Sequence, residues 1–133
     1  MNKFIDTHCH FDFPLFYNDI TTSLSLAQQA QVEKMIIPAV ARWNFDVVTE
    51  LSNEYPQLYS ALGLHPLYIE EHREQHLLEL EQKLKINSRC VAVGEIGLDG
   101  YMENPQPEKQ ERFLIAQLKL AAKFDLPVIL HSR

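Results

Sequence analysis

Glycine and cysteine are scarce in this sequence. Its 133 residues include four Gly, two Cys and one Trp. Two cysteines cannot build the disulfide framework that holds small secreted domains together, so we expect a reducing compartment, the cytoplasm. With so little glycine there is no low-complexity linker, and we expect a single domain over residues 1–133.

Long apolar runs and an excess of positive charge are also missing. No apolar stretch approaches the roughly 20 residues of a membrane helix, and no signal peptide or membrane partner is expected. Lys and Arg number 12 against 18 Asp and Glu, which sets the formal net charge at −6. This balance argues against a broad basic surface for nucleic acid. It leaves open a nucleic-acid substrate that is held by a metal and a few local cations.

The chain does contain a regular alternation of short apolar strands and amphipathic helices. Strands are expected at Phe4–His8, Lys34–Val40, Leu58–Leu64, Cys90–Ile96 and Pro127–His131. Helices are expected at Asp19–Gln31, at Ile69–Lys85 and at Pro107–Phe124. A further helix is expected to begin near Asn44 and to end before Pro56, and a loop is expected at Phe11–Asn18. The strands are apolar and rich in β-branched residues, as in a parallel sheet that is buried on both faces.

This alternation predicts an α/β fold with parallel strands. The strands begin about every 24 to 37 residues, and one βα unit of a (β/α)8 TIM barrel takes about 31. A doubly wound open sheet has the same alternation, so periodicity alone does not separate the two folds.

Polar residues fall where the expected strands end, and they are His8, His10, His65, Glu95 and His131. The carboxyl ends of parallel strands lie on one rim, so these side chains are expected to converge. Three of these four imidazoles, together with the carboxylate, suit Zn²⁺, Mn²⁺, Fe²⁺ or Mg²⁺. Glu95 has two oxygens and is the natural bridge if there are two ions. Without a metal, its carboxylate would be buried and unpaired in an apolar strand, which is costly.

Other polar residues have two interpretations each. His65 is a substrate or pocket residue, or part of a simple turn. Asp6 and Asp99 are candidates to accept a hydrogen bond from a ligand imidazole, and Asp99 can instead cap a loop. Arg133 can pair with a phosphate through its bidentate fork, or be a solvated residue.

Further residues are given structural rather than functional interpretations. His72 and His76 are one helical turn apart, but we expect them to be exposed on a charged helix. Cys9 is expected to face away from its histidine neighbours and to pack. Trp43 and the other aromatics form no stripe that suggests base stacking, and we assign them to the core or the rim.

Four segments resemble, in order, the successive motifs of the TatD family: Asp6–Asp12 (DTHCHFD), Gly63–Pro66 (GLHP), Val93–Asp99 (VGEIGLD) and Leu126–Arg133 (LPVILHSR). The resemblance implies a (β/α)8 barrel of the metal-dependent hydrolase (amidohydrolase-like) superfamily. It implies a metal-dependent phosphoesterase, often a deoxyribonuclease, that uses metal-activated water. It makes His8, His10, Glu95 and His131 metal ligands, with Glu95 bridging and catalytic, and places His65 near the substrate phosphate.

Members of this family are about twice as long as this chain, and their later strands supply another His ligand and an Asp. We therefore expect the N-terminal half of such a barrel, truncated to about five parallel strands and four helices. Its open sheet edges are expected to self-associate or to pair with the missing half. Two alternatives remain: an amidohydrolase that acts on an amide or a lactone, and an inactive fragment that binds metal or a partner chain.

Overall fold

A five-stranded parallel sheet organises the computed structural model, which describes residues 2–133. The strands are β1 Phe4–Asp6, β2 Val32–Pro38, β3 Leu58–Leu62, β4 Cys90–Leu98 and β5 Val128–Ser132. They pair in chain order, and every neighbouring pair is parallel. A doubly wound sheet reverses its strand order at a switch point, and this order does not reverse. The five strands form a half-barrel, which confirms the truncated (β/α)8 fold.

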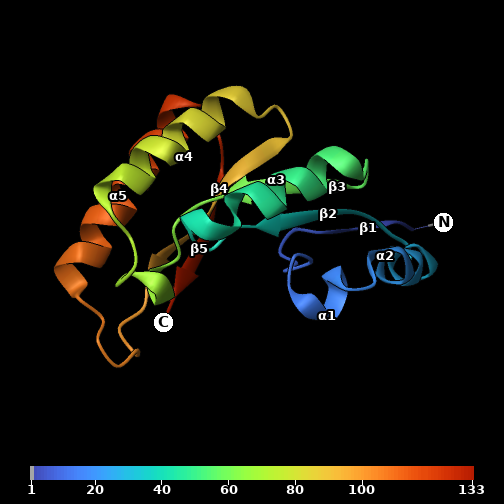
Figure 1. The fold of residues 1–133 in the computed structure, drawn as a ribbon, viewed down its shortest axis with the longest axis horizontal. Coiled ribbons are helices and arrows are strands. Elements are labelled where there is room, and N and C mark those ends of the chain that lie inside the picture. The colour runs from blue at the N-terminus through green and yellow to red at the C-terminus, as the bar shows by residue number, and fades with distance from the viewer. Residues whose placement is uncertain (1) are drawn as a thin grey trace.

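Helices follow the strands and cover the sheet (Figure 1). They are α1 Pro14–Tyr17, α2 Ile20–Gln29, α3 Phe45–Glu54, α4 Glu74–Ile86 and α5 Pro107–Lys123, with 3-10 turns η1 Arg42–Asn44 and η2 Pro66–Tyr68. The Asp19 side chain caps α2 by accepting the backbone N–H of Thr22, and Pro107 occupies the first turn of α5. Within residues 2–133, no helix has both the length and the apolar composition that crossing a membrane requires.

Three differences from the sequence expectation lie close to the site residues. β1 ends at Asp6 and does not continue to His8. The expected loop at 11–18 contains α1, which begins at Pro14, because proline is pre-organised for a first helical turn. α4 begins at Glu74 and not at Ile69, because η2 and a turn come first. Each difference lies in a segment that follows a strand, where the site residues are.

The core lies between the sheet and the helices. Its fully buried side chains come from the middle strands and from the helices that pack on them, and include Ile37, Val48, Leu58, Leu62, Leu80 and Val93. Burying one such side chain contributes about 1.5–3 kcal/mol. The edge strands are less covered: Phe4 and Ile5 of β1 are each 58% exposed, and Leu130 of β5 is 60% exposed. The expectation of strands buried on both faces is therefore wrong for β1 and β5.

Candidate metal centre

Glu95 lies at an irregularity of β4. The β4–β5 register shifts between Gly94 and Ile96, and irregularities of this kind re-aim a side chain. The Glu95 backbone N–H donates to the Ala39 carbonyl at 3.0 Å, which ties this point of β4 to the end of β2. Glu95 is 5% exposed, and its carboxylate faces four imidazoles, two at each oxygen. This buried carboxylate is the centre of the candidate site.

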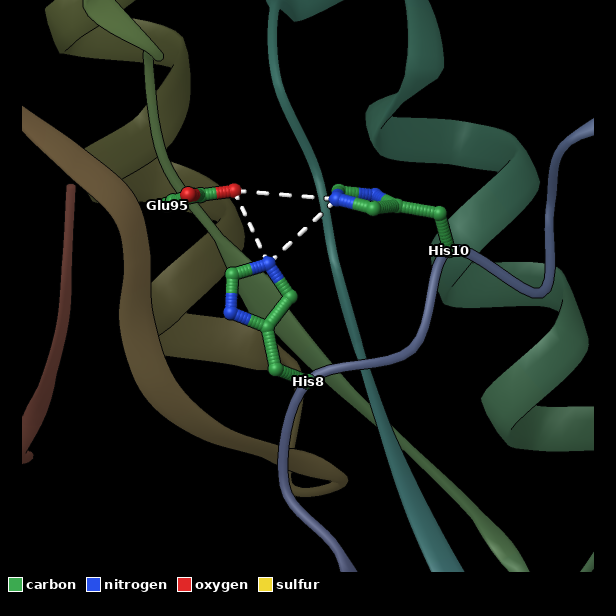
Figure 2. Close-up of side chains that lie close together, drawn as sticks. All are labelled: His8, His10 and Glu95. Atoms are coloured by element: carbon green, nitrogen blue, oxygen red, sulfur yellow. Dashed lines mark hydrogen bonds and ion pairs between the residues drawn. The ribbon is translucent and has the colours of Figure 1, made fainter.

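The first oxygen of Glu95 faces His8 and His10 (Figure 2). Oε1 lies 3.0 Å from Nε2 of His8 and 3.7 Å from Nε2 of His10, and the two imidazole nitrogens are 3.3 Å apart. Tetrahedral zinc with bonds of about 2.0–2.2 Å sets its ligand atoms about 3.3–3.6 Å apart. The spacing of these three atoms therefore fits one small divalent cation.

The loop after β1 holds the two imidazoles in place. The Asp6 carboxylate accepts the backbone N–H of His8 at 3.0 Å, and the Cys9 N–H donates to the Ile36 carbonyl of β2 at 3.0 Å. The Phe13 ring stacks on the His10 ring at a centroid distance of 4.8 Å. Asp6 thus contacts the backbone of His8, whereas the sequence had suggested contact with an imidazole. Cys9 packs against the core, as expected, and burial raises the pKa of its thiol to about 11.

The second oxygen of Glu95 faces His131 at the end of β5. Nδ1 of His131 lies 3.5 Å from Oε2, and its Nε2 lies 2.9 Å from Oδ2 of Asp99. A carboxylate only accepts, so Nε2 carries the proton and Nδ1 presents its lone pair toward Glu95. Burial raises the pKa of Asp99, but hydrogen bonds from His131, Arg133 and the Tyr101 backbone lower it to about 2. Asp99 therefore stays ionised and holds His131 in the tautomer that a ligand needs.

His65 is held in the opposite tautomer. Its Nδ1 accepts the backbone N–H of Leu67 at 3.0 Å, so the proton of the neutral ring lies on Nε2. That Nε2 is 3.4 Å from Oε2 of Glu95, and the residue is 4% exposed. His65, Glu95 and His131 can together surround a cation by distance alone. The tautomer instead makes the Nε2–H of His65 a hydrogen-bond donor that faces Glu95.

The protonation states suit a cation at neutral pH. Burial raises the pKa of Glu95, but the hydrogen bond from His65 and the electrostatic interactions with His65, His8 and His10 lower it to about 2. Burial and the neighbouring His8 lower the pKa of His10. A charged carboxylate and a neutral imidazole are the forms that bind a metal.

Arg133 is tied to Asp99. Its Nε donates to the Asp99 carboxylate at 3.0 Å, and its guanidinium lies over the Tyr101 ring, 5.1 Å from the centroid. The phosphate contact suggested by the sequence would thus compete with the contact between Arg133 and Asp99.

Position 97, close to His131, requires a glycine. Its φ is +149°, and a Cβ there would lie 1.8 Å from the His131 carbonyl oxygen.

The expectation that His72 is exposed is wrong. It is 1% exposed, because α4 begins two residues later and His72 lies in the irregular segment between the preceding turn and that helix. Its Nε2–H donates to the His65 carbonyl at 2.8 Å, and its ring lies near Phe113. Burial lowers the pKa of His72 to about 4. His72 and His76 are therefore no metal pair on a helix, and His72 supports the backbone beside the centre.

Two buried glutamines of α5, which are not evident from the sequence, clamp the loops that carry site residues: each one hydrogen-bonds to both the backbone N–H and the carbonyl of one loop residue. Gln117 accepts the backbone N–H of Leu64 at 2.7 Å and donates to the Leu64 carbonyl at 3.3 Å. Gln110 does the same at Asp99, with distances of 2.7 and 3.0 Å. The available signal was a polar residue at two positions of the stripe that also contains Phe113 and Ala121.

Gln117→Leu is expected to lower the free energy of unfolding by about 1–3 kcal/mol, because it leaves buried polar groups of Leu64 without partners. Denaturant unfolding measures this loss. Gln82→Leu, the same change at an exposed position of α4, is the control and should stay within about 0.5 kcal/mol of the original chain. Equal stability of the two variants would show that the hydrogen bonds between Gln117 and Leu64 do not stabilise the fold.

Comparison with known proteins agrees with this fold. Residues 5–133 match the family model described as TatD related DNase. The chain is 53% identical over 132 residues to the uncharacterized metal-dependent hydrolase YjjV of Escherichia coli K12, and 34% identical over 141 residues to human deoxyribonuclease TATDN3. The crystal structure of YjjV superposes with a TM-score of 0.95, and that of a TatD-family hydrolase from Entamoeba histolytica, 26% identical, with 0.87.

These alignments cover nearly the whole of this chain but only part of each relative. They cover 98% of the chain and 51% of YjjV, and 97% of the chain and 52% of the human protein. The chain thus spans about half the length of the curated relatives that it matches. With a family model matched from residue 5 to residue 133 and a half-barrel that superposes on two solved members, the chain belongs to the TatD family.

Proposed function

We propose that this chain carries the greater part of the metal centre of a hydrolase that cleaves phosphoester bonds with metal-activated water. The observation that supports this most is the buried carboxylate of Glu95, whose two oxygens face different imidazoles. One carboxylate between two sets of nitrogen donors suits a pair of divalent ions better than a single ion.

The residues have distinct parts in this proposal. His8, His10 and Oε1 of Glu95 would hold one cation, while Oε2 of Glu95 and Nδ1 of His131 would contribute to a second. A bound divalent cation supplies Lewis acidity and lowers the pKa of water. Asp99 keeps the His131 lone pair available for a cation.

His65 is proposed to bind the substrate. Its buried Nε2–H points toward the same carboxylate, so it can donate to a phosphate oxygen that enters beside Glu95. The proposed substrate is DNA or a smaller phosphoester, in line with the DNase description of the family and the name of the human relative. Cys9 and Cys90 are both free thiols, which supports the expected cytoplasmic location.

The open edges are proposed to pair with further strands. Within residues 2–133, β1 pairs only with β2 and β5 only with β4, so each has a free side with backbone donors and acceptors. The proposed partner is the polypeptide that corresponds to the remaining half of the relatives, with a second copy of this chain as the competing partner.

The test is hydrolysis by the chain with Mn²⁺, Zn²⁺ or Mg²⁺. The substrates are bis(p-nitrophenyl) phosphate and a single-stranded oligonucleotide, compared with p-nitrophenyl acetate and a lactone. We expect cleavage of phosphoesters only, lost in EDTA and in Glu95→Gln. Cleavage of the lactone but not of the phosphoesters would contradict the proposed substrate class and favour the amidohydrolase alternative.

A further inference from the structure

We propose that Trp43, with Phe13 and Tyr68 beside it, forms a stacking subsite for an unpaired nucleobase next to the metal centre. The inference rests on the proposed function, because it names the part of a nucleic-acid substrate that this rim binds. By sequence alone, these aromatics are assigned to the core or the rim. Their arrangement in the structure supports a binding role.

Trp43 is exposed on a firmly held turn. It lies in η1, directly after the loop that follows β2, and is 56% exposed although Asn44 beside it is buried. The Asn44 side-chain oxygen accepts the backbone N–H groups of Val40 and Ala41 at 3.0 and 3.2 Å, and its amide donates to Asp12 at 2.9 Å. A large aromatic side chain is thus presented to solvent by a rigid backbone, which limits the entropy lost when a ligand stacks on it.

Two sets of ring contacts connect Trp43 with the metal centre. Tyr68 lies edge-on to Trp43 at 5.7 Å and edge-on to His65 at 6.3 Å. Phe13 is stacked on His10, and a cleft of about 320 Å³ has both Phe13 and Trp43 in its walls. The exposed indole is therefore continuous, on both sides, with imidazoles that face Glu95.

The chemistry of the chain favours a base as the occupant. With a net charge of −6, the chain offers little general attraction to phosphates, so a nucleic-acid substrate needs another source of affinity. Stacking on aromatic rings supplies it without regard to sequence, because every base has a π-face. A base held in this cleft would leave its neighbouring phosphate near His65 and Glu95.

Trp43 is the one Trp in the sequence, so its fluorescence reports directly on this subsite. The experiment titrates the chain, in EDTA, with single-stranded oligothymidine and with an abasic oligonucleotide of equal length and charge. We expect the thymidine oligonucleotide to quench the emission, and the abasic one to bind about tenfold or more weakly. Anisotropy of a labelled oligothymidine should show a similar loss for Trp43→Leu and most of the affinity retained in Trp43→Phe.

Leu78→Ala is the matched control, because Leu78 is an exposed apolar residue of α4 outside the cleft. The affinity of this variant for oligothymidine should equal that of the original chain. Equal binding of the two oligonucleotides, no binding of either, or unchanged affinity in Trp43→Leu would overturn the subsite. If any of these results is found and phosphoester cleavage still depends on Glu95, the subsite is refuted but the proposed function is not. Base-dependent quenching that persists in Glu95→Gln would support the subsite separately from hydrolysis.

Discussion

Glu95→Gln is expected to weaken the binding of a divalent cation by at least about 100-fold. Loss of an outer-shell partner alone costs about 10–100-fold, and Glu95 is proposed as a direct ligand through both oxygens. The amide keeps the shape of the side chain but has one oxygen and no charge. Titration calorimetry with Zn²⁺ and Mn²⁺ measures the two affinities.

Stability should follow the same pattern. A cation at 100 times its Kd stabilises the folded chain by about 2.7 kcal/mol, since it binds the folded state alone. EDTA should reverse this gain, and Glu95→Gln should show almost none of it. Glu111→Gln, at an exposed position of α5, is the control and should behave as the original chain does. A Glu95→Gln variant with unchanged affinity would rule out Glu95 as a ligand.

Addition of the complementary half is expected to raise phosphoester hydrolysis at least about 100-fold, which corresponds to about 2.7 kcal/mol in the activation barrier. The polypeptide to use is the part of Escherichia coli YjjV that this chain does not match, because the matched part is 53% identical to the chain and superposes with a TM-score of 0.95. Its strands would pair with the free sides of β1 and β5 and close the rim around Glu95. Sedimentation velocity measures association, and bis(p-nitrophenyl) phosphate hydrolysis measures the gain.

An edge variant separates pairing from other causes of activation. Leu130 on β5 is 60% exposed and Leu78 on α4 is 63% exposed. When the chain is by itself, a lysine at either position should therefore have the same small effect on its stability. Leu130→Lys should block association and the gain in hydrolysis, because a charge on an edge strand opposes pairing. Leu78→Lys should change neither. Association of the two halves that Leu130→Lys leaves intact would show that β5 is not the contact.

The convergence of the site residues was predictable from the sequence, but one of the reasons for it was not correct. A strand was expected to continue to His8, yet β1 ends at Asp6, and the loop after it brings the rings of His8 and His10 together. The position of His72 was mistaken because a helical pattern was extended upstream across η2 and a turn. Local periodicity does not show where a 3-10 turn replaces a helix.

The sequence by itself determined the alternation of strands and helices and the set of polar residues at the strand ends. These follow from local periodicity and from the rule that parallel strands share one rim. The strand order, which does not reverse, distinguishes the half-barrel from a doubly wound sheet. Only the tertiary structure decided which oxygen of Glu95 faces which imidazole, and which tautomers His65 and His131 adopt. It also decided that Gln110 and Gln117 clamp the site and that Trp43 is exposed, because such contacts join residues far apart in the chain and depend on how the elements pack.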